Sequence, residues 1–204
     1  MSPASHEFSI LQMYRSATEA QVEAGTAWYE TARTEAKRLA NLYGVSYRCA
    51  AGVIAVLSPR QKWPQNKLDA ASILRAATSG SSVKPKVSAY GANRDKAWRI
   101  AKGEAPSTVL GGPKVNAFYR NICGDYNGVT VDVWAARVAE PYNLHFAGRP
   151  ETYAVIAEAY TNAAMALGTF PAFVQAVCWI VIRKSTGNES DAQMALWEET
   201  REVA

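Results

Sequence analysis

The segment Tyr47–Leu57 places the strongest constraint on the fold, because it is apolar nearly all the way round a helix. Seven of its residues are Ala, Val, Ile or Leu, and they follow one another almost without interruption from Ala50 to Leu57. A helix that lacks a polar face has to be covered on every side by other parts of the protein. The segment therefore predicts a helix in the middle of a hydrophobic core, started by Ser46 as its N-cap.

Helical signals dominate the rest of the chain. Thr18 and Gln21 have the spacing of a capping box, and Gly44 supplies a stop for the helix that follows it. Strand signals are minimal and no repeat is visible, so the predicted fold class is all-α. The predicted helices span residues 18–43, 47–57, 65–78, 93–102, 106–110, 114–122, 132–139, 151–167, 171–184 and 191–202.

Length and composition predict a globular protein. A chain of 204 residues with 49% hydrophobic residues forms one domain, or two small lobes that share a cleft. Residues 79–92 are rich in Ser, Gly, Lys and Pro and are the candidate linker between such lobes. The most apolar stretch, residues 170–182, is too short to span a bilayer and predicts a buried helix, so no membrane partner is expected.

The cysteines and histidines predict no disulfide framework and no metal. Cys49, Cys123 and Cys178 are widely spaced, and His6 and His145 are the only histidines. The N-terminus lacks the order of charged and apolar residues found in signal peptides. These features predict a reduced, cytoplasmic protein without cofactor. The net charge of +4 favours an anionic partner, although only weakly.

The run Gly111-Gly112-Pro113-Lys114 joins two short predicted helices. Glycine lets the backbone approach a partner closely, and proline suits the first position of a helix. Backbone amides at such a helix start bind phosphate, and Lys114 adds a positive charge. An ordinary corner between two helices is the alternative interpretation of this run.

Asp132 follows Val129-Thr130-Val131 at the start of another predicted helix. Capping of that helix is the simplest role for Asp132. A helix N-terminus favours a charged carboxylate and disfavours a charged amine, which would leave Lys114 partly neutral and nucleophilic. One base and one nucleophile are therefore expected if the fold brings the two residues together.

These two segments together resemble the helix-hairpin-helix DNA glycosylases, the superfamily of endonuclease III and the 8-oxoguanine glycosylases. The resemblance rests on Gly112-Pro113-Lys114 at the hairpin end, Val131-Asp132 in the following loop and Arg137-Val138 on the next helix. Lys114 and Asp132 are 18 positions apart, as in the endonuclease III pattern. Upstream, the run from Ile54 to Ser58 and the pair Asn66-Lys67 are similar to further motifs of the superfamily.

The resemblance implies a two-lobed helical fold across the whole chain and an enzyme that acts on a nucleotide flipped out of duplex DNA. Leu110 stands where the superfamily has the first hairpin glycine, Pro113 is unusual before the lysine, and the iron–sulfur cysteines of endonuclease III are absent. Asp132 is then expected to stabilise positive charge on the sugar, and Lys114 to form a Schiff base. The expected DNA contacts are Gly111, Gly112, Asn116, Arg60, Gln61, Trp63, Tyr119, Arg120 and Trp134.

Two alternatives stay open at this point. A related group of viral enzymes uses the same fold to join amino acids to modified thymidines in DNA, so the fold alone does not determine the reaction. The second alternative is a DNA-binding module without catalysis, in which Lys114 only contacts phosphate. For Arg60, Gln61 and Trp63 a structural interpretation is also open. In it, they form a solvated loop between two helices, and Trp63 packs under that loop.

Overall fold

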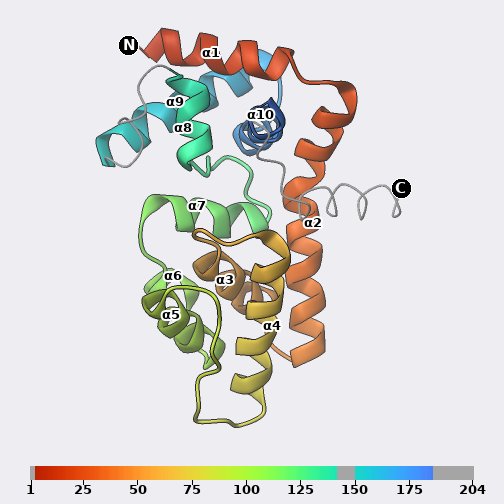
Figure 1. Cartoon of the computed structure of the whole chain (residues 1–204), viewed down its shortest axis with the longest axis vertical. Helices are drawn as coiled ribbons and strands as arrows, with labels where there is room; N and C mark the ends of the chain where they lie inside the picture. Colours follow the sequence, from red (N-terminus) through yellow and green to blue (C-terminus); the bar gives the residue numbers. More distant parts are fainter. Residues whose placement is uncertain (1–2, 142–149, 186–204) are drawn as a thin grey trace. The chain divides into compact units, whose positions relative to one another are not determined.

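The computed structural model describes residues 3–141 and 150–185, and the regular secondary structure of these residues is entirely helical (Figure 1). The prediction of an all-α protein is therefore confirmed. The polar helix predicted over residues 191–202 lies outside the described residues. The helices are α1 (Pro3–Arg15), α2 (Glu19–Tyr43), α3 (Tyr47–Leu57), α4 (Trp63–Thr78), α5 (Gly91–Ala101), α6 (Pro106–Val109), α7 (Pro113–Ile122), α8 (Val133–Ala139), α9 (Pro150–Leu167) and α10 (Pro171–Ser185).

Two predicted helix caps are present. The backbone N–H of Thr18 donates to the side chain of Gln21 at 2.8 Å, and the N–H of Gln21 donates to the Thr18 hydroxyl at 3.3 Å. This reciprocal pair is the capping box at the start of α2. The N–H of Cys49 donates to the hydroxyl of Ser46 at 3.1 Å and so caps α3.

Helix α1 is the one helix in the described residues for which the sequence predicts no structure. On this helix the polar His6 is 1% exposed, whereas the aromatic Phe8 is 59% exposed. A polar residue is thus buried and an aromatic residue exposed, the reverse of the usual arrangement. A surface helix is recognised in a sequence by apolar residues on the buried face and polar residues on the exposed face, so this pattern is weak in α1. The buried imidazole of His6 needs a polar partner elsewhere in the fold.

The chain forms two compact units. The first consists of residues 1–29 and 125–204, and the second of residues 30–124. The chain therefore passes between the units within α2 and again after Gly124. Residues 79–92, the candidate lobe linker, connect α4 to α5 inside the second unit.

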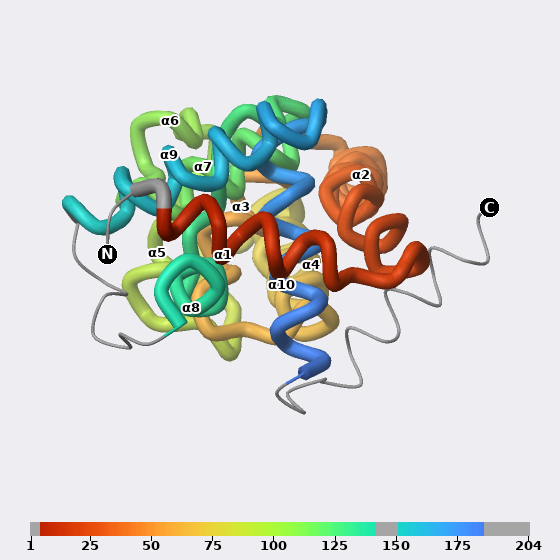
Figure 2. Tube along the Cα trace, turned by 90° about the horizontal axis from the view of Figure 1, so that it is seen from above, coloured from red at the N-terminus to blue at the C-terminus, as the bar shows by residue number. Residues whose placement is uncertain are grey.

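The first unit is built from α1, α8, α9, α10 and the beginning of α2. Helix α1 packs against α8, α9 and α10 (Figure 2). Its Ile10 is completely buried and joins a core formed mainly by small and β-branched residues. Further members of this core are Val131, Ala135, Ile156, Tyr160, Ala163, Val174 and Cys178.

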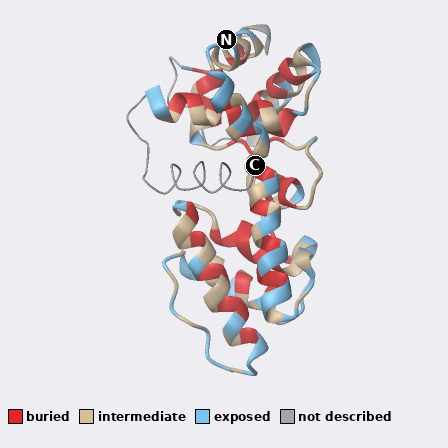
Figure 3. Cartoon of the chain, turned by 90° about the vertical axis from the view of Figure 1, so that its right-hand side faces the viewer, coloured by how far each residue is buried: buried red, intermediate tan, exposed pale blue. Residues whose placement is uncertain are grey.

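The second unit surrounds α3. Every residue of α3 from Ala50 to Leu57 is buried, which confirms the predicted core helix (Figure 3). Helices α4, α5, α6 and α7 all pack against it. Because α3 has no polar face, the four helices around it are held in place by the same apolar surface.

A buried polar pair attaches α1 to α8. Nε2 of His6 lies 2.5 Å from Oε2 of Glu140, the C-cap residue of α8, and the two side chains are 1% and 5% exposed. The residues are 134 positions apart in the chain. A buried polar group that loses its partner destabilises the fold.

We predict that Glu140→Ala lowers the free energy of unfolding by about 1–3 kcal/mol, because it removes a partner of the buried imidazole. Urea unfolding followed by circular dichroism measures this change. Glu158→Ala is the matched control, since Glu158 is exposed on α9, and it should change the stability by less than about 0.5 kcal/mol. Equal effects of the two substitutions would contradict a stabilising role for the pair.

Candidate functional site

The turn between α6 and α7 has a backbone conformation that favours glycine. Gly112, the N-cap of α7, has φ 78° and ψ 147°, a region that is strained for residues with a side chain. Pro113 follows at the first helical position, where no N–H donor is needed. Nδ2 of Asn116 donates to the carbonyl oxygen of Gly112 at 2.9 Å. Asn116, a predicted DNA contact, thus ties the turn to the first turn of α7.

The hairpin rests on α3. A Cβ atom on Gly52 would lie 2.8 Å from Cγ of Pro106, so the absence of a side chain at Gly52 lets α6 approach α3 closely. Leu110 is only 8% exposed. Where the glycosylase hairpin has a glycine, this chain has a side chain that anchors the turn in the core.

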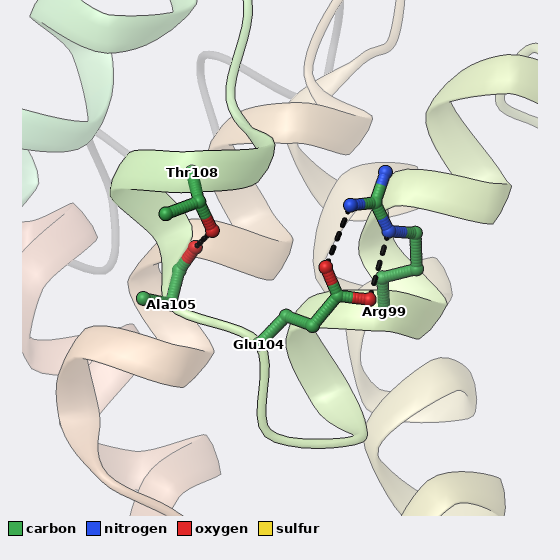
Figure 4. A network of polar contacts seen from close by, with 4 residues as sticks. All are labelled: Arg99, Glu104, Ala105 and Thr108. Atoms are coloured by element: carbon green, nitrogen blue, oxygen red, sulfur yellow. Dashed lines mark hydrogen bonds and ion pairs between the residues drawn. The ribbon is translucent and has the colours of Figure 1, made fainter.

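The connection from α5 to α6 adds polar contacts (Figure 4). Arg99 donates two hydrogen bonds to the carboxylate of Glu104, at 2.8 and 2.6 Å, and the hydroxyl of Thr108 donates to the carbonyl oxygen of Ala105 at 2.8 Å. Hydrogen bonding to Arg99 is the main cause that lowers the pKa of Glu104. Both partners of the ion pair are about half exposed, so it contributes order rather than much stability.

Two lysines from different helices lie at the exposed turn. Lys114 is half-buried at the second position of α7, and the adjacent Gly111 and Gly112 are exposed. Nζ of Lys96, from α5, lies 3.1 Å from the place where a Cβ on Gly111 would be. An exposed helix start with two cations suits an anion such as a phosphate. Lys96 has no motif in the sequence and is brought to the turn only by the packing of α5.

The other candidates on α7 differ in exposure. Tyr119 is half-buried, and burial is the main cause that raises its pKa to about 12. Arg120 is exposed. Of the two, Arg120 is the better placed for a contact with solvent or a partner.

The three candidate DNA contacts that follow α3 also differ in exposure. Arg60 is exposed and Gln61 is half-buried, with its amide nitrogen donating to Asp69 at 2.8 Å. Trp63 is 6% exposed at the start of α4. Nζ of Lys67 lies 6.0 Å from the centre of its ring, and the expected contact of Trp63 with DNA stays a prediction.

Asp132 is the N-cap of α8. Its Oδ1 accepts hydrogen bonds from the backbone N–H groups of Trp134 at 3.0 Å and Ala135 at 2.8 Å. Its Oδ2 accepts a hydrogen bond from Nε1 of Trp179 at 3.1 Å. All three partners are N–H donors, so the half-buried carboxylate acts only as an acceptor and has a fixed orientation.

A cluster of aromatic and cationic side chains adjoins Asp132. The guanidinium groups of Arg137 and Arg183 lie 4.6 and 5.5 Å from the centre of the Trp134 ring. Arg183 also lies 4.8 Å from the ring of Trp179, which in turn lies 5.6 Å from Trp28. Such contacts between cations and aromatic faces hold both kinds of side chain in place.

Trp179 and Arg183 are functional candidates that sequence reasoning left without a role. They are four positions apart and therefore lie on one face of α10. Burial is the main cause that lowers the pKa of Arg183, and attraction to the charge of Asp132 opposes it. The four-residue spacing of Trp179 and Arg183 was the signal in the sequence that could have linked them to each other. Their link to Asp132 comes only from the packing of α10 against α8.

The cysteines are free, and none is an activated thiol. Burial raises the pKa of Cys49 to about 11 and raises that of Cys178 further. Across residues 3–141 and 150–185, no group of three or more His, Cys, Asp or Glu side chains is arranged to hold a metal ion.

Lys114 and Asp132 belong to different units. Lys114 lies in the second unit and Asp132 in the first. The shared cavity that the glycosylase interpretation requires is therefore still a prediction.

A family model described as a family of unknown function, DUF7178, matches residues 2–186. The chain belongs to the DUF7178 family. No curated protein and no solved structure matches this DUF7178 chain. In the part of the chain that the structure describes, no single helix is long and apolar enough to cross a membrane, and two sharply bent helix pairs pass that test only when joined.

We predict that Gly112→Ala lowers the free energy of unfolding by about 1–3 kcal/mol, because alanine is strained at this positive φ. Gly111→Ala is the matched control at the neighbouring position, since its Cβ would meet only the flexible end of Lys96, and it should cost less than about 0.5 kcal/mol. Thermal and urea unfolding of the two variants test the prediction. A larger loss in Gly111→Ala would show that contacts rather than backbone strain govern the turn.

Proposed function

We propose that this protein is a DNA N-glycosylase, which cleaves the bond between the sugar and an extruded base in duplex DNA. Two kinds of support combine in this proposal. The first is the resemblance of the segments around Lys114 and Asp132 to the helix-hairpin-helix glycosylases. The second is the local structure of these segments in the DUF7178 chain. The resemblance suggests the reaction, and the local structure provides groups for DNA binding and for charge stabilisation.

The fixed carboxylate of Asp132 is the observation on which the proposal mainly rests. When the bond to the base breaks, its electron pair leaves with the base and positive charge develops on the sugar. A carboxylate held by three N–H donors cannot turn away, so it stabilises that charge without reorganisation. Since all three partners donate to the carboxylate, we assign it electrostatic stabilisation in preference to proton abstraction.

The hairpin between α6 and α7 is the proposed site for the DNA backbone. Its two exposed glycines leave room for a phosphate, and Lys96 and Lys114 supply positive charge beside them. Contacts of this kind position DNA without reading its sequence, and they weaken as salt rises.

Lys114 has a second proposed role after the base has left. Its neutral amine attacks C1′ of the positively charged sugar, and one proton of the new ammonium group passes through solvent to O4′ as the C1′–O4′ bond breaks, which opens the ring and gives a protonated Schiff base. This imine permits elimination of the 3′ phosphate and therefore strand cleavage. If water attacks C1′ in place of Lys114, the product is an abasic site.

We predict that Asp132→Asn slows base release by at least about 100-fold, because the substitution removes the charge that stabilises the transition state. The amide keeps an oxygen that can cap α8, so the fold and most of the affinity for DNA should remain, and circular dichroism checks the effect of losing the acceptor of the Trp179 indole N–H. Single-turnover release of the base from duplexes that carry a panel of damaged bases measures the rate. Glu158→Gln removes an exposed carboxylate of the first unit and should leave base release unchanged. Normal turnover by Asp132→Asn would exclude the proposed mechanism.

We further predict that borohydride traps the protein covalently on its substrate DNA and that Lys114→Ala abolishes the adduct. The hydride reduces the imine to a stable amine, and gel electrophoresis separates the adduct from free DNA. Lys96→Ala should still form the adduct, with weaker DNA binding. Base release without an adduct identifies a glycosylase that uses water.

DNA binding with neither base release nor an adduct would favour one of the two alternatives. Mass spectrometry of DNA with modified thymidines, incubated with amino acids, then separates a base-modifying transferase from a non-catalytic binding module. A gain of mass identifies the transferase.

A further inference from the structure

Two loops of the second unit are joined into one surface. The first is residues 58–62, between α3 and α4, and the second is residues 83–90, which precede α5. The guanidinium group of Arg60 donates to the hydroxyl of Tyr90 at 2.8 Å and lies 5.8 Å from the centre of its ring. We call these two loops together the paired-loop surface.

Asp69 holds both loops from below. It is a residue of α4 that is only 5% exposed. Its Oδ2 accepts hydrogen bonds from Nε2 of Gln61 and from the backbone N–H of Ser88, both at 2.8 Å, and its Oδ1 accepts one from Nε2 of Gln65 at 2.8 Å. One buried carboxylate therefore links α4, the first loop and the second loop. Both carboxylate oxygens of Asp69 accept hydrogen bonds from within the protein. A partner of this surface would therefore contact other residues of the loops.

The backbone of the first loop is strained at Arg60. This is the one residue other than glycine with a positive φ in the described ranges, at 60°. Such a conformation costs on the order of 1–3 kcal/mol and persists only where surrounding contacts impose it. Here the backbone N–H of Gln61 donates to the carbonyl oxygen of Ser58 at 3.1 Å, so Pro59 and Arg60 are the central residues of a β-turn that holds this conformation. The turn and the bond to Tyr90 together fix the position of the Arg60 side chain.

The exposed charged residues of the two loops are all basic. Arg60, Lys62, Lys84 and Lys86 are all exposed. Asp95 is the neighbouring exposed carboxylate, and it pairs with Lys84 at 2.5 Å. An exposed ion pair of this kind is weak, so a phosphate can replace the carboxylate as a partner of the lysine. Positive charge thus outweighs negative charge among the exposed residues of the two loops.

We infer that the paired-loop surface binds the phosphate backbone of duplex DNA and that Asp69 is the positioning residue that holds its two loops together. The inference rests on the proposed function for the choice of DNA as the anionic partner. Pre-ordered loops lose little conformational freedom on binding, so more of the attraction between lysines and phosphates contributes to affinity. Residues 79–92 then act as part of the binding surface.

Asp69→Asn provides the first test, because the two effects of the substitution have opposite signs. Loss of a negative charge, by itself, strengthens binding to DNA. Loss of an acceptor for the N–H groups of two loops frees those loops and weakens binding. We expect the affinity for an undamaged duplex, measured by fluorescence anisotropy in 0.1 M salt, to fall by at least about twofold to tenfold, the effect of one lost hydrogen bond, because Oδ2 accepts one from each loop. Equal or higher affinity in a folded Asp69→Asn protein would overturn the positioning role.

Lys86→Ala tests the surface without touching the buried carboxylate and keeps the inference testable if Asp69→Asn does not fold. The affinity for the same duplex should fall roughly fivefold to tenfold at 0.1 M salt, because each neutralised phosphate adds about 0.9 to the slope of log K against log salt. Lys37→Ala is the matched control, since Lys37 is exposed on α2 in the same unit. Equal affinity and salt slope in the two lysine variants would overturn the inference.

Separate measurements test the paired-loop surface and the proposed glycosylase reaction. Undamaged duplex reports binding alone, whereas base release depends on Asp132. A Lys86→Ala effect on binding, together with no base release by the wild-type protein, supports the paired-loop surface while rejecting the glycosylase. Tighter binding of single-stranded RNA than of duplex DNA, with the same loss in Lys86→Ala, would overturn the assignment of DNA as the partner.

Discussion

Burial of α3 is the constraint on which the second unit depends. Its residues from Ala50 to Leu57 are all buried, so the surrounding helices are arranged to cover it. Helices α4 to α7 pack around α3. This packing fixes the positions of the loops that connect them. The loop after α3, the segment before α5 and the hairpin before α7 are all such connections. The proposed DNA contacts of this unit therefore take their positions from one apolar helix.

In the first unit, Asp132 combines a structural contact with the catalytic role that we propose for it. Asp132 satisfies two backbone N–H groups at the start of α8, which stabilises the helix. The same contacts, with the indole of Trp179, prevent the carboxylate from rotating. A capping role and a catalytic role are therefore compatible for this residue, because the electrostatic role that we propose requires a fixed charge and no movement.

The cationic residues show how tertiary packing selects among many charges. The chain has 22 Lys and Arg residues, and their number alone says little about a partner. Packing brings Lys96 beside Gly111, ties Arg60 to Tyr90 and stacks Arg183 on Trp134 and Trp179. Each of these arrangements orders a long side chain that would otherwise be mobile, and ordered charges bind an anion at a smaller entropic cost.

The sequence by itself determined the helices of the described residues other than α1, because the apolar run of α3, the capping box of α2 and the Gly-Pro start of α7 act through neighbouring residues. It also identified Asp132 as a cap, since capping is local. Only the tertiary structure decided that α1 is a helix, that Trp63 is buried, and that Asp69 and Trp179 hold the candidate sites. The physical reason is that His6 and Glu140, Asp69 and Ser88, and Asp132 and Trp179 are 134, 19 and 47 positions apart. Contacts over such separations depend on how whole helices pack, which local patterns do not encode.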